Sequence, residues 1–141
     1  MIDMDLDSQM NKIRVTIKSI EESEGITKII SNFASSQLIA VTLELWQNIN
    51  IEDEAFFVFK ETEVGIAKEF SGQVSFSNVL DGKIVDLDIG KILTKVIIKV
   101  ENTEISSIIT TSSARVLNLD KNDQVKLFIK ATEISIEEIG E

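Results

Sequence analysis

Apolar and polar residues alternate along several short segments of the chain. Isoleucine and valine occupy every second position from 13 to 17, with Arg14 and Thr16 between them, and the same period of two returns over 85–89. Successive side chains of a strand point to opposite faces, so this period predicts strands with one buried face. Four more segments rich in valine, isoleucine, leucine and phenylalanine are predicted strands: 38–41, 55–59, 96–100 and 125–129.

Helical character is confined to two short stretches, 43–49 and 112–117. The chain has no proline, and its many β-branched residues favour strands over helices. The sequence therefore predicts an all-β protein with one short helix in each half.

The two halves of the chain repeat. Three pairs of segments correspond in order: 8–13 with 75–80, 39–42 with 107–110, and 53–62 with 123–132. Each unit then has four or five strands and one helical turn. Strands this short avoid open edges by closing into a small Greek-key barrel of the OB type. We expect two tandem OB-like barrels, over residues 1–69 and 70–141, with the junction near Lys68 to Gly72.

Composition and charge exclude several classes of function. The chain has 141 residues, 43% of them hydrophobic, and no cysteine or histidine. This excludes disulfides, thiol catalysis and the commonest general base, and it fits a cytoplasmic protein that is not an enzyme. The N-terminus is acidic and does not read as a signal peptide, and no apolar run is long enough for a membrane span. The net charge of −10 disfavours nucleic acid as a partner, including an OB-type single-strand binder.

Three motifs in the second half carry a resemblance to a known family. They read Ser75-Phe76-Ser77-Asn78-Val79-Leu80-Asp81-Gly82, then Ile109-Thr110-Thr111-Ser112-Ser113 leading to Leu117-Asn118-Leu119, and finally Asp123-Gln124-Val125 leading to Ile129-Lys130-Ala131-Thr132. In this order and spacing they resemble the Mop domain, the molybdate-binding unit of the molbindins, which is related to TOBE domains. The first half resembles it more weakly.

The resemblance implies an oxyanion site, and residue by residue it assigns the site to the second half. The implied binding residues are Ser75, Phe76, Ser77, Thr110, Ser113, Lys130, Ala131 and Thr132. A weaker first-half site would comprise Ser8, Thr42, Lys60 and Thr62. The family's arginine is replaced by Ser77 and Met10, and the first half has Leu45 and Glu61 where the family has a serine and an alanine. The first site has therefore lost a hydroxyl and gained a carboxylate.

The residue types suit a tetrahedral dianion, whose oxygens only accept hydrogen bonds. Hydroxyls, backbone N–H groups and the Lys130 ammonium supply donors. Taken singly, each residue has an ordinary alternative: Thr110 or Ser112 as a helix N-cap, Lys130 as a solvated strand lysine, and Ser75 with Asn78 as a turn.

The leading expectation is therefore a cytoplasmic protein that binds molybdate or tungstate for storage or homeostasis. The family resemblance further implies a homo-oligomer, a trimer or hexamer, with sites between subunits. The alternative is a Mop-fold oligomerisation or interaction module whose anion site has decayed.

Overall fold

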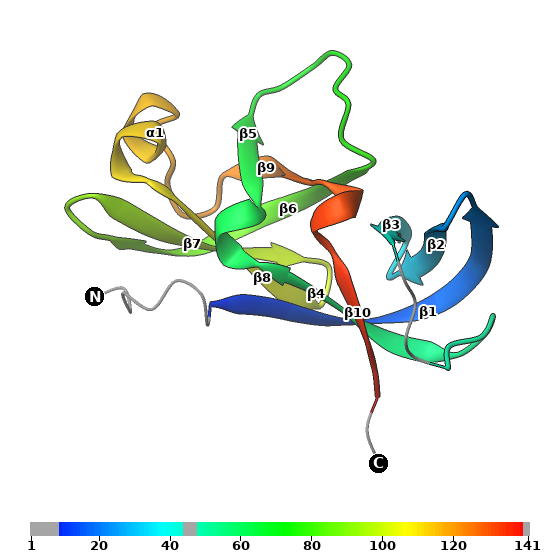
Figure 1. The fold of residues 1–141 in the computed structure, drawn as a ribbon. Helices are drawn as coiled ribbons and strands as arrows, with labels where there is room; N and C mark the ends of the chain where they lie inside the picture. Colours follow the sequence, from blue (N-terminus) through cyan, green and yellow to red (C-terminus); the bar gives the residue numbers. More distant parts are fainter. Residues whose placement is uncertain (1–8, 44–47, 140–141) are drawn as a thin grey trace.

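The computed structural model describes residues 9–43 and 48–139 and consists mainly of antiparallel strands (Figure 1). The first half contains β1 (Met10–Ser23), β2 (Ile26–Phe33), β3 (Ser36–Thr42), β4 (Glu54–Lys60), the 3-10 turn η2 (Glu61–Glu63) and β5 (Gly65–Lys68). The second half contains β6 (Asn78–Ile89), β7 (Leu93–Val100), β8 (Thr103–Thr110), the helix α1 (Thr111–Val116), β9 (Gln124–Ile129), the 3-10 turn η3 (Ala131–Glu133) and β10 (Ser135–Glu138).

The two halves exchange their last strands. The strands form two five-stranded sheets, in the orders β10-β4-β1-β2-β3 and β5-β9-β6-β7-β8. β5 follows the first-half strands in sequence but pairs with β9, and β10, at the end of the second half, pairs with β4. In Figure 1, β10 accordingly runs from the second half down to β4 and β1. Each sheet is therefore completed by the other half of the chain.

The repeat seen in the sequence recurs in backbone detail. β1 has a register shift between Ile17 and Ser19, and β6 has one between Ile84 and Asp86, 67 residues later. In each half, the bulged residue before the shift exchanges two backbone hydrogen bonds with the loop that leads into β4 or β9. Bulges of this kind bend a long strand and increase its twist. Both halves thus curl their first strand by the same device.

Two buried asparagines, one in each half, connect the halves through hydrogen bonds. Asn78 accepts from the backbone N–H of Ile39 at 2.7 Å and donates to its carbonyl at 2.9 Å. Asn11 makes the same two bonds with Ser106, at 2.9 and 2.8 Å. Each asparagine satisfies one backbone donor and one acceptor on an edge strand of the opposite sheet. The asparagine of the opening motif therefore stabilises the contact between the two halves.

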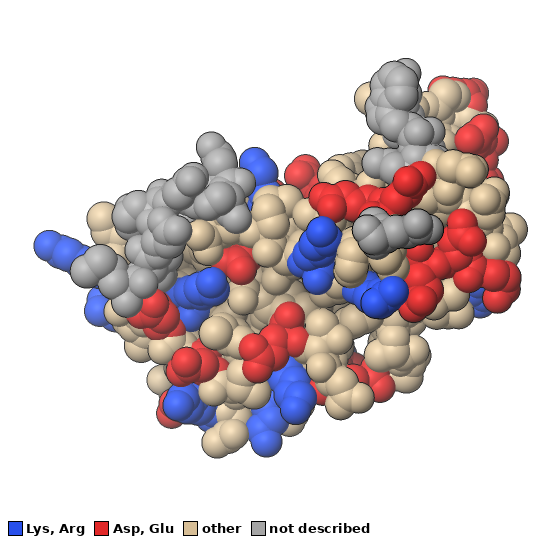
Figure 2. Space-filling model, turned by 90° about the horizontal axis from the view of Figure 1, so that it is seen from below, with Lys and Arg blue, Asp and Glu red and all other residues tan. Residues whose placement is uncertain are grey.

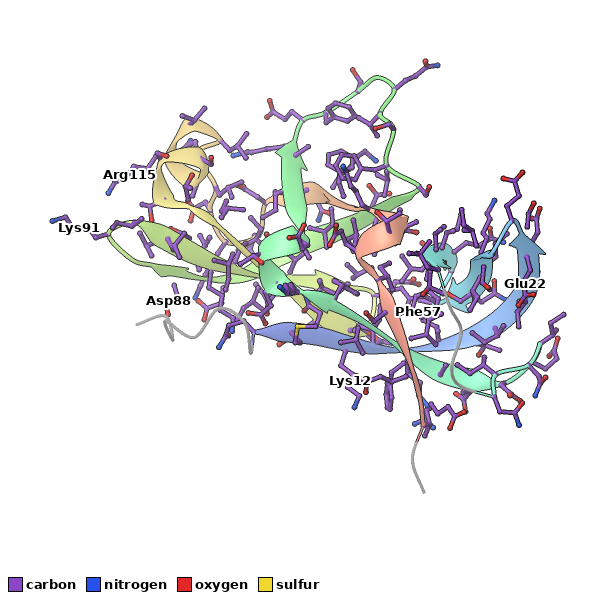
Figure 3. All side chains as sticks on the ribbon, viewed as in Figure 1. Lys12, Glu22, Phe57, Asp88, Lys91 and Arg115 are labelled. Atoms are coloured by element: carbon purple, nitrogen blue, oxygen red, sulfur yellow. The ribbon has the colours of Figure 1, made fainter. Side chains whose placement is uncertain are left out.

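Apolar side chains of both halves form one core. The fully buried side chains include Phe57 and Phe59 of β4 and Leu127 and Ile129 of β9, and they belong to one cluster. Figure 3 shows Phe57 in the interior. Phe56 faces the other way, where the Lys12 ammonium lies 4.6 Å from its ring centroid. The strand predicted over 55–59 is thus present as β4, and Val58 is buried as well.

The all-β, OB-like fold class is confirmed, and the six predicted strands lie within β1, β3, β4, β6, β7 and β9. The predicted helix at 112–117 is α1, displaced by one residue. The predicted helix at 43–49 lies largely outside the described residues, as does Ser8. The division into residues 1–69 and 70–141 stays a prediction, and the strand exchange crosses it.

Charge is spread unevenly over the surface. Figure 2 shows lysines and arginines interspersed with acidic residues, and acidic side chains gather towards the end occupied by β1 and β2. Glu21, Glu22 and Glu24 lie there, at the tip of the β1–β2 hairpin, and all three are exposed. None of the helices within 9–43 and 48–139 has the length and apolar character needed to span a bilayer.

Candidate functional site

A cavity of about 600 Å³ lies where α1, β8 and η2 meet. Residues from both halves line it, because η2 of the first half packs against β8 of the second. Its polar lining consists of Thr62, Glu63, Thr110, Ser113, Lys130 and Glu133. Its apolar lining consists of Val64, Gly65, Phe76, Leu93, Ile108 and Ile109. The cavity thus joins hydroxyls and an ammonium to a largely apolar wall.

The start of α1 supplies an ordered set of hydroxyls. Thr110 is the N-cap, and its Oγ1 accepts from the Ser113 backbone N–H at 3.1 Å. Thr110 Oγ1 also accepts from the Ser112 hydroxyl at 3.2 Å and donates to Ser113 Oγ at 2.8 Å. The Ser113 hydroxyl hydrogen ends this chain and has no acceptor among the described residues. It is available to a ligand in the cavity.

Lys130 brings positive charge to the same cavity. It follows β9 directly, and its side chain is exposed. In the described part of the chain its ammonium makes no ion pair, whereas Lys126, four residues earlier, is bound to Asp81 at 2.7 Å. An unpaired ammonium can form charge-assisted hydrogen bonds to an anion. Glu63 and Glu133 also line the cavity and oppose an anion there.

The aromatic side of the cavity is held by stacked rings. Phe76 lies against Phe128 with ring centroids 5.4 Å apart, and Phe70 meets Phe128 edge-on at the same distance. These contacts fix the segment 70–77, which connects the exchanged strand β5 to β6. Phe76 therefore packs against Phe128 and also lines the cavity.

The structure regroups the residues that the motifs assign. Phe76, Thr110, Ser113 and Lys130 come together, and they are joined by Thr62, which the sequence assigns to the first-half site. Six predicted residues that the structure describes do not line this cavity: Ser75, Ser77, Ala131, Thr132, Thr42 and Lys60. Ala131 and Thr132 belong to η3, which packs against β3, the strand that ends at Thr42. The closing motif of each half thus lies beside the edge strand of the other half.

Glu61 of η2 forms an ion pair with a lysine of the second half. Its side chain is buried, with its carboxylate 3.3 Å from the Lys95 ammonium on β7. The carboxylate therefore lies beside a positive charge and outside the cavity lining, and its effect on a first-half anion site stays a prediction. The pair joins η2 to the second half.

Seven residues that line the cavity were not assigned to a site from the sequence: Glu63, Val64, Gly65, Leu93, Ile108, Ile109 and Glu133. Glu63 and Glu133 occupy equivalent positions in η2 and η3, so the closing motif could have been extended by one residue to include both. Within the described ranges, no group of three carboxylates is placed to hold a metal ion.

The second half of the chain matches a known domain family. Residues 75–136 match the family model of the TOBE domain. The TOBE match begins at the opening motif and ends in β10, so it includes α1, Lys130 and the exchanged last strand. No curated protein matches the chain in sequence.

The whole chain has a fold seen in a solved structure. It is similar to the cytoplasmic molybdate-binding protein ModG in a crystal form with molybdate bound, with a TM-score of 0.88 and 22% sequence identity. The alignment covers 94% of this chain and 98% of that chain. The likeness therefore extends over both halves and over the strand exchange, and at this identity it establishes the fold.

Proposed function

We propose that this protein binds a tetrahedral metal oxyanion, molybdate or tungstate, at the cavity beside α1. The observation that carries the proposal is the meeting of Thr110, Ser113 and Lys130 in one cavity, although they come from two separate motifs. The TOBE match over residues 75–136 and the fold shared with a molybdate-binding protein support it.

The donors suit the ligand. The oxygens of molybdate only accept hydrogen bonds. Within residues 9–43 and 48–139, the Ser113 hydroxyl hydrogen has no acceptor and the Lys130 ammonium has no ion-pair partner. Hydrogen bonds to charged groups contribute about 1.5–3 kcal/mol each. Five such bonds would supply the roughly 8 kcal/mol that micromolar affinity requires, or more, before ordering costs are subtracted.

The site acts by binding and not by catalysis. Its hydroxyls are hydrogen-bonded to one another with no adjacent histidine or cysteine to activate them, and the chain contains neither residue type. We therefore infer a cytoplasmic binding protein for storage or homeostasis of the ion. We also infer a homo-oligomer, a trimer or hexamer, because the cavity is open to solvent and another copy of the chain would enclose the ion.

The first half is proposed to be a second, diverged copy of the same domain. The equivalent bulges and the two asparagine clamps support this. Its candidate site would involve Thr42 and Lys60 together with the η3 residues that pack against β3.

Titration calorimetry with molybdate and with tungstate tests the proposal. We expect binding by the wild-type protein, and affinity weakened about tenfold or more in Lys130→Met, from the loss of one charge-assisted bond. Lys126→Met is the matched control, because it removes the same charge from a lysine already paired with Asp81. Absence of heat with both ions refutes the function, and unchanged affinity in Lys130→Met refutes the role of that residue.

Native mass spectrometry separates the proposal from the alternative of a decayed site. Protein purified after growth with molybdate is expected to carry the bound oxyanion. An oligomer with no bound oxyanion would favour the interaction module.

A further inference from the structure

A buried chain of hydroxyls ties α1 to the β6–β7 hairpin. Thr111 donates to the carbonyl of Gly90 at 2.7 Å, and its Oγ1 lies 2.8 Å from Thr94 Oγ1. Because Thr111 has one hydroxyl hydrogen and directs it to Gly90, the Thr94 hydroxyl is the donor to Thr111. The backbone N–H of Thr111 also donates to the carbonyl of Ile92 at 2.8 Å. Thr94 is fully buried and Thr111 is 2% exposed.

The hydrogen bonds of Thr111 determine where α1 begins. The helix has six residues, Thr111–Val116, and only Thr111 and Ala114 among them are buried. A helix this short is not stable in water by itself, so its position depends on the contacts that its buried residues make. In Figure 3, Arg115 on α1 and Lys91 at the tip of the β6–β7 hairpin lie at the same end of the molecule.

The anchored residue lies between the cavity hydroxyls. Thr110 precedes Thr111, and Ser113 follows two residues later; both are exposed to the cavity while Thr111 points inward. The inward bonds of Thr111 therefore set the positions from which Thr110 and Ser113 present their oxygens. Binding groups held only loosely lose affinity, because their ordering must be completed when the ligand binds.

The sequence of the first half does not repeat this pair of hydroxyls. Thr27, 67 residues before Thr94, is also buried on the matching strand β2, at 4% exposure. Thr27 pairs with Thr42 where Thr94 pairs with Ile109, so the position that corresponds to Thr111 in the sequence of the first half is Glu44, which has no hydroxyl. The first half thus keeps one member of the hydroxyl chain and has lost the other.

We propose that Thr94 and Thr111 are positioning residues of the oxyanion site, which hold the first turn of α1 against the β6–β7 hairpin so that Thr110 and Ser113 face the ligand. This inference rests on the proposed function. Thr94 and Thr111, which do not touch the ion, thereby join the residues that determine the affinity for it. In the second-half site, the hydroxyls of Thr110 and Ser113 are then already held in the positions that binding requires.

The test compares matched valine substitutions by molybdate calorimetry and thermal unfolding. Thr94→Val and Thr111→Val keep the side-chain shape and remove the hydroxyl, whereas Thr111→Ser keeps the hydroxyl. Thr27→Val is the control, since it removes a buried hydroxyl from the equivalent strand of the other half. Hydrogen exchange of the α1 amides reports whether the helix is released.

We expect molybdate affinity to fall about tenfold in Thr94→Val and Thr111→Val, with faster exchange in α1. Thr111→Ser and Thr27→Val are expected to bind within about twofold of wild type. Wild-type affinity in both valine variants overturns the inference while leaving the proposed function intact. An equal loss in Thr27→Val also overturns it, because the effect would then follow general stability. If Thr111→Val does not fold, Thr94→Val and Thr111→Ser decide the matter. Absence of binding in the wild type itself refutes the proposed function, and the positioning role with it.

Discussion

Gly82 of β6 provides the sharpest prediction about packing, because no space exists for a side chain there. A Cβ atom at this position would lie 2.5 Å from Ile98 Cγ2 and 3.1 Å from Val100 Cγ2, both on β7. Ile98 is fully buried and branched at Cβ, so it cannot swing aside as a flexible chain end would. We predict that Gly82→Ala destabilises the protein through this clash.

The magnitude follows from two opposing effects. Overpacking of a core costs about 1–3 kcal/mol, and replacing glycine by alanine returns about 0.4–1 kcal/mol by restricting the unfolded chain. We expect a net loss of about 1–2 kcal/mol in the free energy of unfolding, measured by urea denaturation.

The first half shows how the clash can be relieved. The equivalents of Gly82 and Ile98 are Val15 and Ser31, both buried, and the Ser31 hydroxyl donates to the Leu38 carbonyl at 2.9 Å. In the first half the large residue is Val15 on β1 and the small one is Ser31 on β2. In the second half the small residue is Gly82 on β6 and the large one is Ile98 on β7. Ile98→Ser alone should cost about 2–5 kcal/mol, as a large-to-small core substitution. The double variant with Gly82→Ala should cost at least about 1 kcal/mol less than the sum of the two single changes. Additivity within about 0.5 kcal/mol would refute the reasoning.

Three further predictions concern the strand exchange, one ion pair and the cavity charge. A stop codon at Ser135 removes β10 and with it the buried Ile136, so we expect a loss of at least about 2 kcal/mol in unfolding free energy; an unchanged urea midpoint would show that β10 is dispensable. The Lys68 ammonium, 2.9 Å from Asp123, and the Asp120 backbone N–H lower the pKa of the Asp123 carboxyl. A lowered folded-state pKa stabilises the protein above the unfolded value, 3.8, and this contribution is lost as the pH falls through the folded value. The stability gap between wild type and Lys68→Met should therefore shrink in acid, and a constant gap would contradict it. Glu133→Gln removes a carboxylate from the cavity lining and should tighten molybdate binding by about two- to fivefold in calorimetry at low salt; weaker binding would show that the carboxylate supports the site.

Local patterns in the sequence predicted most strands because alternation is a property of each segment alone. The period of two over 13–17 and 85–89 lies within β1 and β6 as expected. β2 was missed, since its apolar positions are interrupted by Thr27 and Ser31, both of which are buried. β5 and β10, of four residues each, are too short for a periodic pattern.

The strand exchange and its effect on the site could not be predicted from the repeat. A duplicated motif indicates that each half has the same elements, but not which copy of β5 or β10 completes which sheet. Because η2 lies against β8, Thr62 shares a cavity with Thr110 and Ser113, although the motifs place them in different sites. The inward turn of Glu61 towards Lys95 likewise depends on a contact between the halves.

The most direct test of the account is a crystal of the protein grown with tungstate, measured at a wavelength where tungsten scatters anomalously. The account predicts an anomalous peak within hydrogen-bond distance of Ser113 Oγ and Lys130 Nζ, on the wall formed by the start of α1. A peak elsewhere, with this cavity empty at saturating tungstate, would contradict it.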